Sequence, residues 1–139
     1  MTGRIRVPPR ALVDSSVWIE AWRRVGAAAT LEEHLAGHEL VFSRIVELEL
    51  LMGARDEREW RRISEFLAGQ LFVSTSDGQW TQAARIYCDL RRRGITVRSS
   101  NDCLLAQQAL DEGLLVLHRD PDFAAIAEVR PLRQRFVEL

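Results

Sequence analysis

A chain of 139 residues, with 47% hydrophobic and 28% charged residues, has the size and composition of one folded domain, so we expect a single globular unit over residues 1–139. All 19 basic residues are arginine, which excludes mechanisms that need a lysine, such as Walker-type phosphate binding and Schiff-base chemistry. The net charge of −1 excludes attraction of nucleic acid by a globally basic surface, so such a contact must use locally gathered arginines.

Short apolar runs alternate along the chain with segments of helical periodicity. The runs predict buried strands at 11–13, 40–42, 71–73 and 114–117. The periodic segments predict helices at 16–24, 27–35, 44–54, 57–68, 78–93, 102–112 and 122–128. The partly alternating tail, 133–139, is expected to add an edge strand. Together they predict an α/β fold with three layers (α/β/α) around a central, mainly parallel sheet of four or five strands.

The location of the protein in the cell can be predicted from two kinds of segment that the sequence lacks. No window approaches the roughly 18 to 20 apolar residues of a membrane span, and the first ten residues lack the apolar stretch of a secretory signal. We therefore expect a cytoplasmic protein without membrane contact. Cys88 and Cys103 lack CxxC spacing, so both are expected to be reduced and packed.

Acidic residues follow the predicted strands. Asp14 comes directly after the run 11–13, and Asp120 and Asp122 come shortly after 114–117. In open parallel sheets, reactive groups gather beyond the carboxyl ends of the strands, so these carboxylates are expected at one edge. Asp102 lies in the first turn of a predicted helix, where free amides and the helix dipole favour the ionised carboxylate. We expect Asp102 to stay charged.

A further carboxylate, that of Glu49, falls in the middle of a predicted helix on a mostly apolar face with Ile45 and Met52. A carboxylate there is costly unless it is paired or bound to metal. Glu47 lies on a neighbouring face, and the spacing leaves it open as the alternative.

Each of these acids taken alone could close a turn or cap a helix. Four segments that send carboxylates to one end of a sheet, without a histidine or cysteine cluster, instead predict a site for a hard cation, Mg²⁺ or Mn²⁺. The chemistry that such a site favours is phosphodiester hydrolysis.

Four stretches in this order and spacing resemble the PIN-domain nucleases, and the last two resemble the VapC toxins of bacterial VapBC toxin–antitoxin pairs: LVDSSVWIE, ELLMGAR, GITVRSSNDCLLAQQAL and LHRDPDFAAIA. The resemblance runs from Leu12 to about Val129. It implies a PIN-like fold with Asp14 as a metal ligand and Ser16 as its supporting hydroxyl. The family glutamate precedes a glycine by four residues, which selects Glu49, counted back from Gly53, over Glu47.

The same resemblance implies roles for residues later in the chain. The family's Asn-Asp pair matches Asn101 and Asp102, and its fourth acid matches Asp120, with Asp122 as the alternative. His118 stands where threonine is common in the family. We expect His118 to pack or form hydrogen bonds and assign it no catalytic role.

The function that the resemblance implies is a Mg²⁺-dependent endoribonuclease toxin. Its acids would hold one or two ions, water would attack the phosphodiester, and the products would carry a 5′-phosphate and a 3′-hydroxyl. A VapB-type antitoxin would neutralise the protein, and homodimerisation is also implied. The alternative is a catalytically inactive PIN-like interaction module.

Two groups of residues are candidates for contacts with RNA or a partner. Arg98, four residues before Asp102, is the stronger RNA candidate, followed by Arg92 and Arg93, which a solvated helix end would also explain, and then by Arg119. On the first helix, two tryptophans four residues apart predict either core packing or an exposed patch for a partner: Trp18 and Trp22.

Overall fold

The computed structural model describes residues 7–139, and these form seven helices and four strands. In chain order they are β1 (Arg10–Val13), α1 (Ser15–Arg23), α2 (Ala27–Leu35), β2 (Glu39–Val41), α3 (Arg44–Met52), α4 (Glu57–Ala68), α5 (Asp77–Arg92), α6 (Ser100–Glu112), β3 (Leu115–His118), α7 (Pro121–Ile126) and β4 (Gln134–Phe136). The prediction that the chain has no secretory signal rests partly on residues 1–6, which lie outside the residues that the structure describes.

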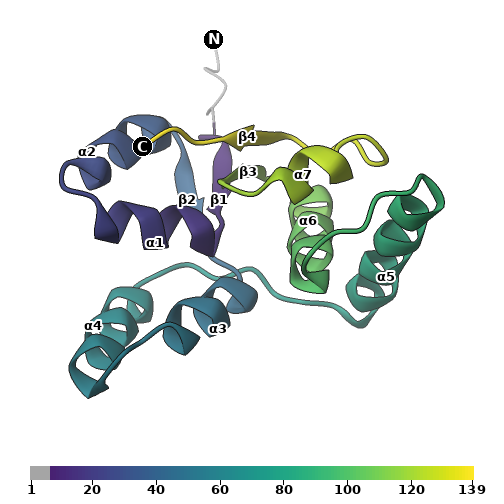
Figure 1. Ribbon diagram of the computed structural model, residues 1–139. Helices are drawn as coiled ribbons and strands as arrows, with labels where there is room; N and C mark the ends of the chain where they lie inside the picture. The colour runs from purple at the N-terminus through teal and green to yellow at the C-terminus, as the bar shows by residue number, and fades with distance from the viewer. Residues whose placement is uncertain (1–6) are drawn as a thin grey trace, which may run out of the picture.

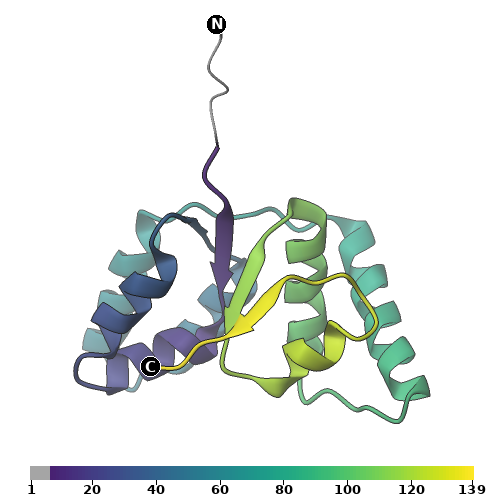
Figure 2. The same cartoon turned by 90° about the horizontal axis from the view of Figure 1, so that it is seen from above.

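The four strands form one sheet in the order β2-β1-β3-β4, and every neighbouring pair is parallel. Figures 1 and 2 show helices on both sides of the sheet, with α1 and α2 on one side and α5 and α6 on the other. The predicted three-layer α/β/α fold is confirmed. Because the strands are parallel, the segments that follow β1 and β3 leave the sheet at the same edge.

The run 71–73, predicted as a strand, contributes only a single parallel bridge between Phe42 and Phe72. Phe42 donates its N–H to Leu71 and accepts from the N–H of Val73, at 2.8 and 2.9 Å. The pairing stops there because Ser43 caps the start of α3 directly after Phe42, so no further strand residues remain to pair. The sheet therefore has four strands, and the fourth is the predicted edge strand in the tail, β4.

Helix α6 is the most deeply buried helix of the described chain. All residues from Asp102 to Ala109 are buried, so no polar face is left over this stretch. A helix that is buried all round needs neighbours on every side, and α5, α7 and β3 supply them. This packing fixes the first turn of α6, which carries Asp102, relative to the end of β3.

Both cysteines are free thiols, Cys103 buried and Cys88 half-buried. Burial raises the pKa of the Cys103 thiol to about 11, which keeps it protonated and unreactive at neutral pH. Across residues 7–139, the helices are all too short or too polar to cross a membrane.

Candidate metal centre and family

Asp14 links the end of β1 to the start of α1. Its N–H donates to the carbonyl of Leu117 on β3 at 2.9 Å, and its carboxylate caps α1 by accepting from the N–H of Ser16 at 3.2 Å. The hydroxyl of Ser16 also donates to this carboxylate and accepts from the N–H of Arg119 at 3.1 Å. Ser16 therefore ties Asp14 to the segment that follows β3.

Glu49 lies half-buried on α3 and faces Asp14. Its Oε1 accepts from the hydroxyl of Ser15 at 3.3 Å. Burial raises the pKa of Glu49, the charge of Asp14 raises it further, and the hydrogen bond from Ser15 opposes the rise. Glu47 instead pairs with Arg44 at 2.7 Å, away from the other acids. The arrangement thus brings Glu49, and not Glu47, to the group of carboxylates.

Asp102 is 4% exposed and stands behind Ser99, which caps α6. Its Oδ2 atom is buried and has no hydrogen-bond partner among the described residues. Burial, followed by the charges of Asp14 and Asp120, raises the pKa of Asp102 to about 9. The expectation that the helix start keeps Asp102 ionised was wrong for the metal-free protein. Desolvation and repulsion between carboxylates outweigh the helix dipole.

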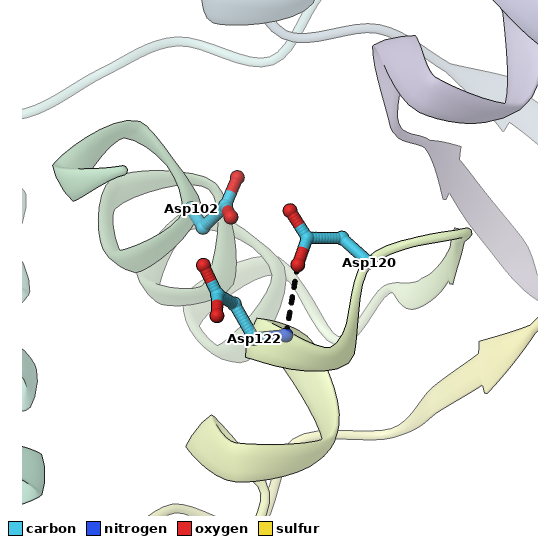
Figure 3. A group of neighbouring side chains, drawn as sticks. All are labelled: Asp102, Asp120 and Asp122. Atoms are coloured by element: carbon cyan, nitrogen blue, oxygen red, sulfur yellow. Dashed lines mark hydrogen bonds between the residues drawn. The ribbon is translucent and has the colours of Figure 1, made fainter. Parts of the chain in front are cut away.

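Asp120 and Asp122 both join Asp102. Oxygens of the three carboxylates lie within 4.8 Å of one another, and Figure 3 shows the side chains converging from α6 and from the start of α7. Asp120 caps α7 by accepting from the N–H of Asp122 at 2.9 Å. Asp122 in turn accepts from the N–H of Arg98 at 2.8 Å. Both Asp120 and Asp122 therefore lie close to Asp102, and their positions do not select one of them as the fourth acid.

The electrostatics of this group favour a cation. Burial raises the pKa of Asp14, and the charge of Asp120 adds to the rise, although the hydrogen bonds from Ser16 oppose it. Several carboxylates crowded together with an unpartnered oxygen on Asp102 are costly unless a positive charge joins them. Oxygen-only ligands suit a hard divalent ion, so the residues present fit Mg²⁺ or Mn²⁺.

The predicted RNA-contacting arginines differ in how free their side chains are. The guanidinium of Arg92 lies 3.8 Å from Asp89, and that of Arg93 donates to the carbonyl of Glu128 at 3.4 Å. Arg119 donates to the carbonyl of Val137 at 2.6 Å. Arg98 is exposed and is held beside the acids through its main chain, which keeps it the strongest candidate.

Asn101 and Ser15 each adjoin one of the acids in the sequence, but they have different surroundings. Asn101, predicted as a supporting residue, lines a groove between α5 and α6. Ser15 was not singled out from the sequence, although it orients Glu49. The serine pair directly after Asp14 was the available signal, because consecutive residues in a first helical turn point to different neighbours.

The two tryptophans of α1 divide between the two predicted roles. Trp18 is buried and stacks on Phe42, with ring centroids 5.5 Å apart. Trp22 is 42% exposed and touches Phe66 edge-on. Trp18 therefore belongs to the core, whereas Trp22 is available to a partner.

Comparisons with known proteins agree on one family. Residues 11–129 match the model of the PIN domain. The chain is 35% identical over 127 residues to VapC ribonuclease Mb1587 of Mycobacterium bovis, covering 88% of this chain and 95% of that protein. Ribonuclease VapC51 of Mycobacterium tuberculosis is 30% identical over 118 residues, covering 85% of each chain.

A solved structure shows the same fold. The complex VapBC2 from Rickettsia felis, bound to a DNA fragment from its promoter, contains a chain that matches with a TM-score of 0.74 at 17% identity, over 92% of this chain and 98% of that one. Matched motifs, shared fold and the convergent carboxylates agree, and the chain belongs to the PIN-domain family, in its VapC branch.

Proposed function

We propose that this protein is a Mg²⁺-dependent endoribonuclease, with Mn²⁺ as a substitute ion, and that it acts as a toxin restrained by a VapB-type antitoxin. The observation that carries the proposal is the convergence of carboxylate oxygens of Asp102, Asp120 and Asp122 to within 4.8 Å of one another. A buried oxygen of Asp102 that has no hydrogen-bond partner within residues 7–139 adds to it. The relatives named ribonuclease, which match along most of the chain, support the same reaction class.

The acids divide into direct holders of the ion and their neighbours. Asp102, Asp120 and Asp122 would hold the ion. Asp14 stands outside this group of three and would be a further ligand, because its charge acts on Asp102 and Ser16 fixes its carboxylate. Bound Mg²⁺ supplies Lewis acidity, which activates water and offsets the charge of the scissile phosphate.

Glu49 is suited to receive a proton from the attacking water. Burial and the charge of Asp14 raise its pKa, which makes it a better proton acceptor than an ordinary carboxylate. The hydroxyl of Ser15 donates to Oε1 and orients the carboxylate, which keeps lone pairs available for the proton. Because the attacking group is water, the 2′-hydroxyl of RNA takes no part in the reaction. A single 2′-deoxy substitution at the cleavage site should therefore leave cutting intact.

RNA must approach a group of negative charges, so nearby arginines are needed to hold its backbone. Arg98 is the first candidate, because its main chain is bound to Asp122 and its side chain is exposed. Arg92 and Arg93, at the end of α5, would contact phosphates further along the strand. Replacing Arg98 with Gln should weaken RNA binding and reduce its dependence on salt.

The test of the activity is cleavage of RNA by the purified protein with Mg²⁺ and with EDTA. Cutting should require the ion and fall at least about a hundredfold in Asp102→Asn, because a metal ligand is lost. Asp111→Asn is the matched control, since Asp111 lies at the far end of the same helix and binds Gln79 and Gln107. Intact RNA with wild-type protein in both Mg²⁺ and Mn²⁺ would favour the inactive interaction module.

The surface that we assign to the antitoxin lies over α1, α3 and α4. Two adjoining hollows of about 320 and 280 Å³ share Trp22, Arg62 and Ile63. Arg23 lines the smaller of the two. Within residues 7–139, neither Arg23 nor Arg62 forms an ion pair. An amphipathic antitoxin segment with an apolar anchor and carboxylates would fill the hollows and pair with these arginines.

The homodimer is a separate proposal, and the groove between α5 and α6 is its surface. This groove has a volume of about 330 Å³ and is lined by Trp80, Tyr87 and Leu104 among others. Trp80 is 61% exposed and lies beside the other apolar residues of the groove, and such an exposed apolar patch is typical of a protein–protein contact. Sedimentation should show a dimer that Trp80→Glu disrupts, while a monomeric wild type would contradict the assignment.

A further inference from the structure

His118 is a buried side chain next to the acid group, and the reaction proposed above does not use it. It ends β3, is 1% exposed, and has a partner at each ring nitrogen. Nδ1 lies 3.1 Å from the main-chain nitrogen of Asp120, and Nε2 lies 2.6 Å from Oε1 of Gln134. The imidazole therefore bridges the edge strand β4 and the main chain of a predicted metal ligand.

The two partners determine which nitrogen carries the hydrogen. A main-chain N–H can only donate, so Nδ1 must offer its lone pair to Asp120. Nε2 then carries the hydrogen and donates to the side-chain oxygen of Gln134. If Gln134 could not accept this hydrogen bond, the other tautomer would become available, and Nδ1–H would face the N–H of Asp120 without forming a bond.

The ring is also held by its surroundings. Its centroid lies 4.9 Å from that of Phe123 on α7 and 5.9 Å from that of Phe136 on β4. The carbonyl of His118 accepts from the N–H of Val137 at 2.8 Å, next to the pairing of His118 with Phe136. Because the main chain and the ring of His118 are both fixed, the lone pair of Nδ1 is held in one position relative to the N–H of Asp120.

Asp120 depends on this position. Its N–H is bound to His118, and its carboxylate accepts from the N–H of Asp122 while facing Asp102. We propose that His118, held by Gln134, is a positioning residue that fixes the main chain of Asp120 and so aims its carboxylate at the ion shared with Asp102. This inference rests on the proposed metal-dependent function.

Two variants of similar size separate the effects of the two hydrogen bonds that the ring nitrogens of His118 form. In His118→Asn the side-chain oxygen can take the place of Nδ1 and accept from Asp120, but the side chain cannot reach Gln134. In His118→Gln the amide can reach Gln134 but offers no acceptor at the position of Nδ1. Both variants lose the ring contacts with Phe123 and Phe136, so both should unfold at similarly lowered temperatures.

The affinity for Mn²⁺, measured by calorimetry on the folded proteins without RNA, distinguishes the variants. His118→Gln should bind Mn²⁺ about ten to a hundred times more weakly than wild type, the usual cost of losing a group that orients a metal ligand. His118→Asn should stay within about threefold of wild type. Equal losses in both variants, or none in His118→Gln, would overturn the positioning role.

A measurement on the unaltered protein keeps the inference testable if the variants do not fold. In ¹⁵N-labelled wild type, NMR should show a coupling across the hydrogen bond between the Asp120 amide nitrogen and Nδ1 of His118, with the ring hydrogen on Nε2. A hydrogen on Nδ1 would refute the inference and leave the nuclease proposal standing. Wild-type protein that binds no Mn²⁺ would overturn both.

Discussion

The hydroxyl of Ser15 donates to Oε1 of Glu49 at 3.3 Å and thereby joins the first turn of α1 to the middle of α3. This bond opposes the rise in the pKa of Glu49 that burial and the charge of Asp14 cause. Ser15→Ala should raise the pKa of Glu49 further. It should also slow RNA cleavage about tenfold at neutral pH, because the carboxylate of Glu49 loses the hydrogen bond that orients it. Ser15→Thr keeps the hydroxyl and is the control. Equal rates in wild type and Ser15→Ala would show that Glu49 needs no such orientation.

The two glutamates of α3 provide a matched comparison. Glu49→Gln should reduce cleavage at least about a hundredfold, because it removes the proposed proton acceptor next to Asp14. Glu47→Gln breaks only an exposed pair with Arg44, so activity and unfolding temperature should change little. Rates from single-turnover cleavage of one RNA decide the matter. If Glu47→Gln slows cleavage more than Glu49→Gln does, the assignment of Glu49 as the proton acceptor is wrong.

Binding of the ion should release protons at neutral pH. Without metal, the pKa of Asp102 is raised to about 9, so this carboxyl is mostly protonated at pH 7, and a cation must displace the proton. Calorimetric titration of Mg²⁺ in two buffers with different ionisation enthalpies should give different apparent heats. Above pH 9 the release should disappear. Identical heats in both buffers at pH 7 would indicate that Asp102 is already ionised.

The same raised pKa sets the direction of the pH dependence of stability in the metal-free protein. The folded form holds the Asp102 proton more tightly than the unfolded form, whose pKa is near 3.8, so this contribution to stability is fully present below pH 3.8 and is lost as the pH rises towards 9. Asp102→Asn removes the cost of ionisation. At pH 8 without metal, it should raise the unfolding temperature by about 3 °C or more, and it should abolish the further rise that Mg²⁺ gives to wild type.

The tryptophans of α1 should respond to truncation in opposite ways. Trp18→Ala leaves a cavity beside Phe42 and should cost about 3 to 5 kcal/mol of folding free energy, measured by urea unfolding. Trp22→Ala should cost far less stability but weaken binding of the proposed antitoxin segment at least about tenfold. An antitoxin that binds Trp22→Ala as tightly as wild type would place the interface elsewhere.

Hydrophobic periodicity predicted both ends of every helix to within two residues. A long amphipathic segment fits few secondary structures other than a helix. The prediction from the apolar pattern failed at 71–73, where pairing depended on how soon α3 begins after Phe42. Asp14, Asp120 and Asp122 could be predicted from their places after β1 and β3, and Asp102 from its place at the start of a helix. The choice of Glu49 over Glu47 needed the family resemblance. Their protonation could not be predicted, because the pKa of Asp102 depends on how deeply the fold buries it and on charges 88 residues away at Asp14 and 18 away at Asp120.

The carboxylates that meet at the edge of the sheet come from positions 14 to 122, and Asp120 and Asp122 arrive only with α7. Without the segment that begins α7, two of the three carboxylates that lie within 4.8 Å of one another would be missing. A cation therefore finds its full set of ligands only once segments more than a hundred residues apart have packed together, which ties ion binding to completed folding.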